Sequence, residues 1–233
     1  MIEIQNLKKV YSGVVVVNIP KLSIRKGETI GLVGNNGAGK TTLFRMMLDL
    51  IRCTSGQIIS KEADVSKNDS WKNYTAAYLD EGFLIDYLTP EEYFYYIGSL
   101  HNLNKPEIDL QLEKFNDFFN AEILNKKKYI RDLSKGNQSK VGVAACLIQK
   151  PEVLMLDEPF ANIDPSTQIR LKNMIREINR EKHITTIISS HDLNHLTDVC
   201  ERILLMEKGL IIKDMETNKN TLEELEDYFS VLQ

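Results

Sequence analysis

The sequence predicts an α/β fold with a parallel sheet, because three short runs of apolar and β-branched residues each end at chemically distinctive side chains. The runs are residues 29–33, 153–156 and 185–190. Runs of this length and composition are typical of parallel strands that are buried on both faces. Ligands of open α/β sheets bind at the carboxyl ends of the strands. We therefore expect the residues that follow the three runs to form the functional site.

The composition is that of a soluble globular protein. The chain has 233 residues, of which 42% are hydrophobic and 27% are charged, and its net charge is −4, whereas nucleic-acid-binding domains usually carry a basic excess. The first residues, MIEIQNLKKV, lack the apolar segment of a secretory signal, and no apolar run approaches the roughly 18 residues of a membrane-spanning helix. Cys53, Cys146 and Cys200 form no CxxC pair. We therefore expect a cytoplasmic protein with reduced thiols that binds no nucleic acid.

The first run leads into a phosphate-binding loop. After residues 29–33 the chain reads GNNGAGKT, a full match to G-x-x-x-x-G-K-[ST], and apolar residues then recur at helical spacing. Glycines let several backbone N–H groups point at one anion, to which the helix adds its positive N-terminal end. Lys40 supplies a catalytic positive charge to the β- and γ-phosphates, and the Thr41 hydroxyl is a ligand for Mg²⁺. The sequence thus predicts a nucleoside triphosphate site made by Gly34, Asn35, Asn36, Gly37, Ala38, Gly39, Lys40, Thr41 and Thr42.

The second and third runs end in candidate catalytic residues. Asp157 and Glu158 close the second run, and Pro159 indicates a turn there. Asp157 can then bind Mg²⁺ while Glu158 acts as the base for water; without the phosphate loop, two such acids would equally suit a solvated turn. His191 ends the third run and could contact the γ-phosphate or orient the water, although a lone histidine is usually structural. The Asn-Lys-x-Asp motif of GTPases is absent from the sequence.

With these motifs in order, the chain resembles the ATP-binding subunit of an ABC transporter over essentially its full length. Residues 34–42 resemble the Walker A loop of that family, and residues 153–158 resemble its Walker B strand. LSKGN at 133–137 stands where the family has its signature, and ANIDP at 161–165 resembles its D-loop. Further matches are YLDE at the Q-loop position, His191 as the switch histidine and Tyr11 as the aromatic that stacks on adenine.

The resemblance implies that two such chains, or two homologous ones, pair head to tail around ATP and Mg²⁺. Ser134, Gly136 and Asn137 of the signature, with Asp164 of the D-loop, would then contact the nucleotide held by the opposite chain. Glu81 takes the position of the Q-loop glutamine, with Asp80 before it, and could still bind Mg²⁺.

The signature departs from the usual LSGGQ of the family. Lys135 and Asn137 replace a glycine and the glutamine. Such variants resemble the subgroup that serves ABC-2-type exporters, so the resemblance favours export.

We expect one domain over residues 1–233, in three parts. Residues 1–30 suit an antiparallel β region, about 82–145 a helical subdomain that carries the signature, and the remainder a P-loop NTPase core. Residues 60–73 are polar and predict an exposed loop. Thr89-Pro90-Glu91-Glu92 is a capping box that predicts the start of a helix.

Together these features predict an ATP-hydrolysing subunit that powers a separately encoded transmembrane permease from the inner face of the membrane. One alternative is a soluble ABC ATPase that remodels a macromolecular complex, although two fused nucleotide domains would favour it and this chain has one. A weaker alternative is a regulatory subunit without turnover, against which Lys40, Asp157, Glu158 and His191 argue. The sequence leaves the transported substrate open.

Overall fold

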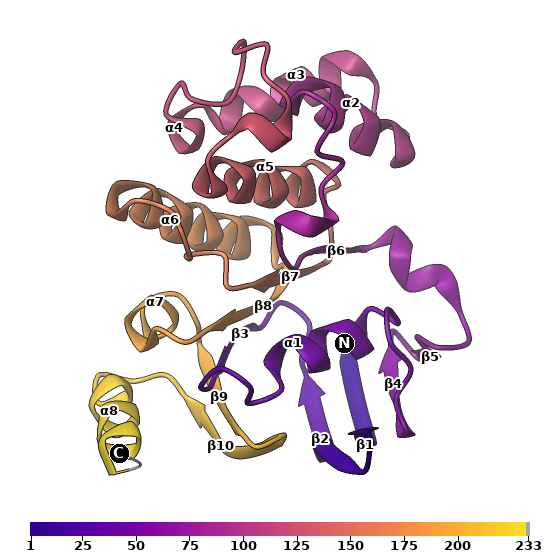
Figure 1. Cartoon of the computed structure of the whole chain (residues 1–233), viewed down its shortest axis with the longest axis vertical. Helices are drawn as coiled ribbons and strands as arrows, with labels where there is room; N and C mark the ends of the chain where they lie inside the picture. Colours follow the sequence, from indigo (N-terminus) through magenta and orange to yellow (C-terminus); the bar gives the residue numbers. More distant parts are fainter. Residues whose placement is uncertain (232–233) are drawn as a thin grey trace.

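Two sheets and a helical layer make up the structure, a computed structural model (Figure 1). It describes the backbone of residues 1–231 and their side chains except those of Glu81, Lys182 and Val231. The central sheet has six strands in the order β10-β9-β3-β8-β7-β6, and a second sheet has four in the order β2-β1-β4-β5. The α/β fold with a parallel core that the sequence predicts is confirmed.

The central sheet places the three predicted runs side by side. β3 (Thr29–Val33), β8 (Thr185–Ser190) and β7 (Val153–Asp157) are adjacent and parallel, and every residue in them is buried. β6 (Thr75–Tyr78) pairs in parallel with β7, and β9 (Arg202–Glu207) with β3. Only β10 (Leu210–Glu216) runs antiparallel to its neighbour. The carboxyl ends of β3, β7 and β8 therefore meet at one edge.

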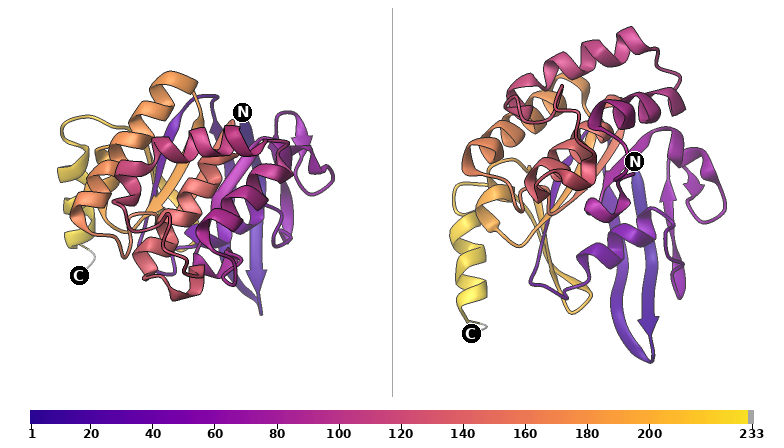
Figure 2. Two further views of the ribbon diagram at one scale, coloured as in Figure 1. Left: turned by 90° about the horizontal axis from the view of Figure 1, so that it is seen from above. Right: turned by 45° about the horizontal axis from the view of Figure 1, so that its top comes forward.

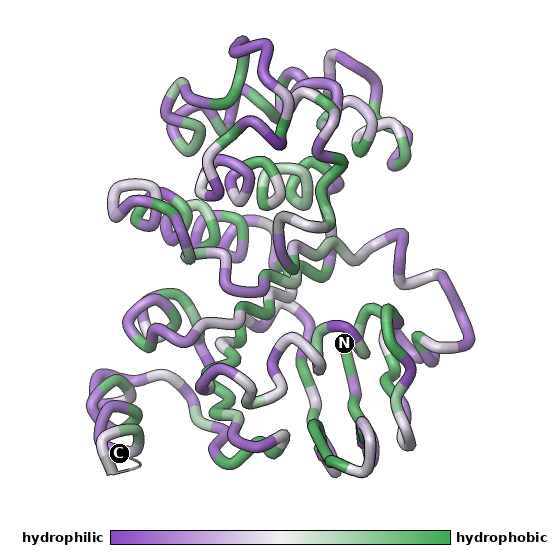
Figure 3. The backbone as a smooth tube through the Cα atoms, viewed as in Figure 1, coloured by the Kyte–Doolittle hydropathy of each residue, from purple (hydrophilic) through white to green (hydrophobic). Residues whose placement is uncertain are grey.

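The two faces of the central sheet support two separate hydrophobic cores. Along β7, Leu154 and Leu156 face one core, while Val153 and Met155 face the other. The first core contains the helical part of the chain, with α5 (Lys135–Ile148) and α6 (Pro165–Lys182). The second contains α1 (Lys40–Met47) and the antiparallel sheet. Figure 3 shows the apolar residues concentrated along the central strands, as expected for strands covered on both faces.

The antiparallel sheet extends beyond the predicted 1–30 region. It contains β1 (Ile2–Tyr11), β2 (Val14–Ile24), β4 (Ser55–Ser60) and β5 (Ala63–Asp64). The prediction of an exposed loop over residues 60–73 is wrong in part, because β5 and a 3₁₀ helix (Asp69–Asn73) lie there. Trp71 explains the difference: its ring is buried in the second core, and its Nε1 donates a hydrogen bond to the Val65 carbonyl at 3.1 Å.

The helical layer lies over the sheet at one end of the molecule (Figure 2). It contains α2 (Pro90–Leu100), α3 (Lys105–Lys114), α4 (Asn116–Phe119) and the signature helix α5, with short 3₁₀ helices at Glu81–Phe83 and Ile130–Asp132. The predicted capping box is confirmed, since Thr89 and Glu92 exchange side-chain and backbone hydrogen bonds. Phe94, Phe115, Phe118 and Phe119 form the buried aromatic centre of this layer.

Two further helices flank β9 and β10 in the chain. α7 (Leu193–Thr197) follows β8 and packs on it, and α8 (Thr221–Val231) packs against α7. α8 lies at the end of the molecule opposite the helical layer (Figure 1). Within the described part of the chain, no helix is both long enough and apolar enough to cross a membrane.

Candidate functional site

The phosphate loop lies between the end of β3 and the start of α1. Its residues line a pocket of about 220 Å³, which Val16 of β2 and Glu158 also border. Gly39 has φ 108°, and a Cβ there would come within 2.8 Å of the Val16 carbonyl oxygen. Only glycine fits this approach without strain. The loop thus leaves the backbone at the N-terminus of α1 open to an anion.

Lys40 and Thr41, the first residues of α1, reach opposite members of the acidic pair. Lys40 is 6% exposed, and its Nζ lies 2.6 Å from the Gly34 carbonyl oxygen and 3.5 Å from Glu158 Oε1. The Thr41 hydroxyl donates to Asp157 Oδ2 at 2.6 Å. The loop and the strand end that were predicted separately are therefore in direct contact.

Glu158 lies between two predicted catalytic residues. Besides Lys40, its carboxylate meets His191, whose Nδ1 is 2.9 Å and whose backbone N is 3.3 Å from Glu158 Oε2. The Glu158 backbone has φ 50°, in the left-handed region that is uncommon for a glutamate. The turn at Pro159 that the sequence indicates thus directs the Glu158 side chain towards the phosphate loop.

Asp157 is the buried member of the pair. Burial raises the pKa of its carboxyl, while hydrogen bonds from Ser189 and Thr41 act in the opposite direction. Each carboxylate oxygen accepts one of these hydroxyls, Oδ1 from Ser189 and Oδ2 from Thr41. The sequence analysis did not single out Ser189; the signal it carried is a hydroxyl in a buried strand, at the end of the run that precedes His191.

The site offers Mg²⁺ only a few protein ligands. Among the described residues, no group of three or more His, Cys, Asp or Glu side chains could hold a metal ion. Mg²⁺ at nucleotide sites usually binds one or two protein oxygens and completes its shell with phosphates and water. The neighbouring oxygens of Thr41 and Asp157 fit such an ion. Glu81, the third predicted ligand, has its side chain outside the described part of the structure.

The signature residues lie at the start of α5, on the other face of the central sheet from α1. Ser134 is the N-cap, and its hydroxyl accepts a hydrogen bond from the Asn137 backbone N at 3.3 Å. Gly136 packs against the D-loop, where an added Cβ would lie 2.4 Å from the Asn162 carbonyl oxygen. Signature and D-loop are thus held together as one surface.

Asp164 of the D-loop is the N-cap of α6. Its carboxylate accepts hydrogen bonds from the Ser166 hydroxyl at 2.5 Å, the Thr167 hydroxyl at 2.6 Å and the Thr167 backbone N at 3.0 Å. These bonds, that from Ser166 first, hold the pKa of the Asp164 carboxyl well below its ordinary value. Asp164 is therefore ionised at neutral pH and fixes the direction in which the D-loop enters α6.

Tyr11 ends β1 at the tip of the antiparallel hairpin. Its side chain is 46% exposed, and Lys9 Nζ lies 4.7 Å from the centre of its ring. The next strand, β2, carries Val16 to the edge of the phosphate pocket. The Tyr11 ring is thus exposed on the hairpin whose second strand borders the phosphate pocket.

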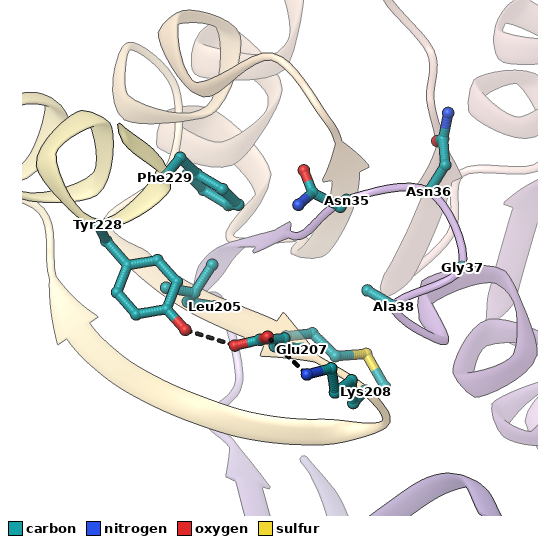
Figure 4. Close-up of a pocket in the computed structure, with 10 residues that line it drawn as sticks. Asn35, Asn36, Gly37, Ala38, Leu205, Glu207, Lys208, Tyr228 and Phe229 are labelled. Carbon is teal, nitrogen blue, oxygen red and sulfur yellow. Dashed lines mark hydrogen bonds and ion pairs between the residues drawn. The ribbon is translucent and has the colours of Figure 1, made fainter. Parts of the chain in front are cut away.

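A second pocket, of about 200 Å³, lies between the phosphate loop and α8 (Figure 4). Asn35 and Asn36 lie on one side, and Tyr228 and Phe229 of α8 on the other. The Tyr228 hydroxyl donates to Glu207 Oε2, which ties α8 to the end of β9. The sequence analysis did not predict this neighbour of the phosphate loop.

Comparison with known proteins identifies the family. A family model described as "ABC transporter" matches residues 17–161, which include both the phosphate loop and the signature. An uncharacterised ABC transporter ATP-binding protein of Synechocystis is 34% identical over 195 residues, which are 82% of this chain and 54% of that protein. The chain therefore spans about half the length of this relative.

A second relative, a methionine import ATP-binding protein of Bacillus anthracis, is 32% identical over 235 residues, which cover 94% of this chain and 67% of the relative. Among solved structures, the dimeric ATP-binding cassette described as a post-hydrolysis state bound to ADP and phosphate has a TM-score of 0.82. It is 20% identical and covers 94% of this chain and 99% of its own. The chain therefore belongs to the ABC transporter family as an ATP-binding protein with the P-loop ATPase fold.

Proposed function

We propose that the chain binds ATP with Mg²⁺, hydrolyses it and thereby powers a membrane transporter. The observation that carries the proposal is the direct contact of the phosphate loop with the end of β7, which in turn contacts His191 at the end of β8. Lys40 lies 3.5 Å from Glu158 and Thr41 lies 2.6 Å from Asp157, while His191 lies 2.9 Å from Glu158. General-base hydrolysis of a bound triphosphate needs this combination of cation, metal ligand and base.

In this mechanism the backbone of residues 34–42 and the Lys40 ammonium hold the phosphates. Thr41 and Asp157 would hold Mg²⁺, which when bound would neutralise phosphate charge. In the structure, Glu158 Oε1 contacts Lys40 and Oε2 contacts His191. When ATP binds, the γ-phosphate replaces Glu158 as the ion-pair partner of Lys40. The Glu158 carboxylate is then free to accept a proton from water. His191 keeps its contact with Glu158 and orients that carboxylate.

We further propose that Ser134, Gly136, Asn137 and Asp164 act on the nucleotide of a second chain. The support is their placement as one surface on the opposite face of the sheet from α1, together with the dimeric cassette of similar fold. A loop that starts a helix is suited to a phosphate. The single domain of residues 1–233, with its helical subdomain over about 82–145, would then serve both its own nucleotide and that of its partner.

The transmembrane partner is proposed to bind the helical layer. Phe83 and Tyr87, which follow the Q-loop position, and Tyr96 of α2 are exposed apolar side chains there. Aromatic residues are enriched at protein interfaces. Docking at this layer would keep the chain on the inner face of the membrane. Glu81 is proposed to link the nucleotide site to this surface.

The departures of the signature, Lys135 and Asn137, favour an exporter of the ABC-2 type over an importer. The methionine import relative shows that ATP-binding proteins of comparable similarity also serve import. Direction is therefore tested on the complex itself. In inside-out membrane vesicles, ATP added outside reaches the nucleotide domains, so an exporter accumulates its substrate inside the vesicle and an importer empties it.

Purification of the chain from membranes, with identification of the proteins that accompany it, tests the function as a whole. We expect a multi-spanning membrane protein in stoichiometric amount and ATP hydrolysis by the complex. Recovery of only soluble assemblies with the ATPase would instead support the remodelling alternative. A complex that binds ATP without turnover would support the regulatory one.

A further inference from the structure

Ser189 occupies an unusual place between the two acids. It lies on β8, fully buried, and pairs in parallel register with Asp157 of β7. A hydroxyl has one hydrogen to donate and two lone pairs with which to accept. At this position both kinds of contact are made, and each goes to a different member of the acidic pair.

The donor contact goes to the proposed metal ligand. The Ser189 hydroxyl donates to Asp157 Oδ1, while the Thr41 hydroxyl donates to Oδ2 of the same carboxylate at 2.6 Å. If Thr41 and Oδ2 turn to a metal ion, the bond from Ser189 still fixes the plane of the carboxylate. Partners of this kind, which hold a ligand without touching the metal, strongly affect metal affinity.

The acceptor contact goes to the proposed base. The Glu158 backbone N donates to the Ser189 hydroxyl at 3.0 Å and also lies 3.2 Å from the Ser189 carbonyl oxygen. Glu158 has φ 50°, a conformation that needs support from its surroundings in a residue with a Cβ. The bond from its N–H to Ser189 supplies such support at the residue whose side chain meets Lys40 and His191.

We propose that Ser189 is a positioning residue that couples the Mg²⁺ ligand Asp157 to the base Glu158, an inference that rests on the proposed ATPase function. Loss of the hydroxyl frees the Asp157 carboxylate to rotate and removes one of the two acceptors of the Glu158 N–H. The defect is therefore specific. Mg²⁺ is bound more weakly and turnover is slower, while nucleotide binding without Mg²⁺ is retained.

Ser189→Ala is compared with Thr185→Val, a matched control on the same strand. The Thr185 hydroxyl is also buried and accepts a hydrogen bond, from the Gly27 backbone N at 2.9 Å. It lies at the opposite end of β8 from the acids. Each variant thus loses one buried, hydrogen-bonded hydroxyl from the same strand, and only one of them touches the site.

The first readout is the thermal stabilisation of each variant by a non-hydrolysable ATP analogue, titrated with Mg²⁺. We expect Ser189→Ala to need about ten-fold more Mg²⁺ for the half-maximal shift, and its shift without Mg²⁺ to equal that of the unmutated chain. The second readout is kcat for ATP in saturating Mg²⁺, which should fall about ten-fold, as for loss of a hydrogen bond to a charged group. Thr185→Val should match the unmutated chain in both.

The proposal is overturned if Ser189→Ala and Thr185→Val show the same Mg²⁺ midpoint and the same kcat. If Ser189→Ala does not fold, Ser189→Cys, with its weaker donor of similar size, is judged against the same control and by the same criteria. The Mg²⁺ titration needs no turnover. A chain without ATPase activity would therefore refute the proposed function while still deciding the role of Ser189.

Discussion

The two proposed halves of the ATP site are built in different ways. Lys40, Thr41, Asp157, Glu158 and His191 are joined to one another by side-chain contacts at the ends of buried parallel strands. The surface of signature and D-loop begins two helices instead, and its contacts are internal ones, such as Gly136 against Asn162 and Asp164 with Thr167.

This difference shows what each half needs in order to work. The first half is organised by the sheet before any ligand arrives, so single substitutions there should remove the chemistry directly. The second half has helix N-termini suited to an anion, and under the proposed dimer another chain would have to supply that anion. The predictions below separate the two halves, starting with the largest effect.

Glu158→Gln should bind ATP and lose at least about 100-fold in hydrolysis rate, because an amide cannot accept the proton of water. The rate of ATP hydrolysis and the equilibrium binding of ATP, measured on the same preparation, test the two expectations. Asp192→Asn, which neutralises the partly exposed carboxylate that caps α7, is the matched control and should retain activity. Near-normal turnover in Glu158→Gln would show that another residue is the general base.

Mixing two inactive chains should restore part of the activity if the second half acts on a partner. Lys40→Ala damages the phosphate loop and spares the signature, whereas Gly136→Asp spares the loop and places a carboxylate in the signature. A mixed dimer contains one site made of two intact halves, so recovery of up to about a quarter of normal ATPase is expected for random pairing with independent sites.

Gly136→Asp also adds a side chain where a Cβ would approach Asn162, so its fold must be checked by circular dichroism. ATP-dependent dimer formation by the mixture is measured alongside, because the two sites could have to act together. Full activity of Gly136→Asp by itself would refute a role for the signature.

Tyr11→Ala should weaken nucleotide binding about five-fold, as expected for about 1 kcal/mol of ring contact, and should leave kcat nearly unchanged. ATP and GTP should be affected alike, since stacking does not read the edges of a base. Direct binding titrations with both nucleotides measure this. Val14→Ala, at an exposed apolar residue on the same hairpin, is the control. An unchanged ATP affinity in Tyr11→Ala would show that the adenine ring does not stack on Tyr11.

The smallest effect concerns the stability of the D-loop. Hydroxyl and backbone donors lower the folded-state pKa of Asp164 from its ordinary value of 3.8. The ionised carboxylate therefore stabilises the folded state at pH values above 3.8. The stabilisation is lost as pH falls through the lower, folded-state pKa. Asp164→Asn should therefore melt slightly below the unmutated chain at neutral pH, and the gap should narrow below about pH 4. A gap that widens in acid would contradict this role.

The sequence by itself determined the class of the fold and which residues were predicted to form the first half of the site. The G-x-x-x-x-G-K-[ST] loop lies between an apolar run and a stretch of helical spacing, and the acids and histidine close two other apolar runs. Because parallel strands end at one edge, their meeting could be expected. The capping box at Thr89 was equally predictable, since its hydrogen bonds join residues close in sequence.

Only the tertiary structure decided contacts between distant segments. In the sequence, nothing distinguishes Ser189 from other hydroxyl residues in strands. Its contacts with Asp157 and Glu158 arise only because β8 pairs with β7 in this register. Val65 and Trp71 anchor an otherwise largely exposed polar stretch to the second core, and α8 lies beside the phosphate loop. Local sequence patterns indicate the hydrogen bonds and the periodicity within one helix or strand. Register and packing depend on which elements become neighbours, and this depends on interactions across the whole chain.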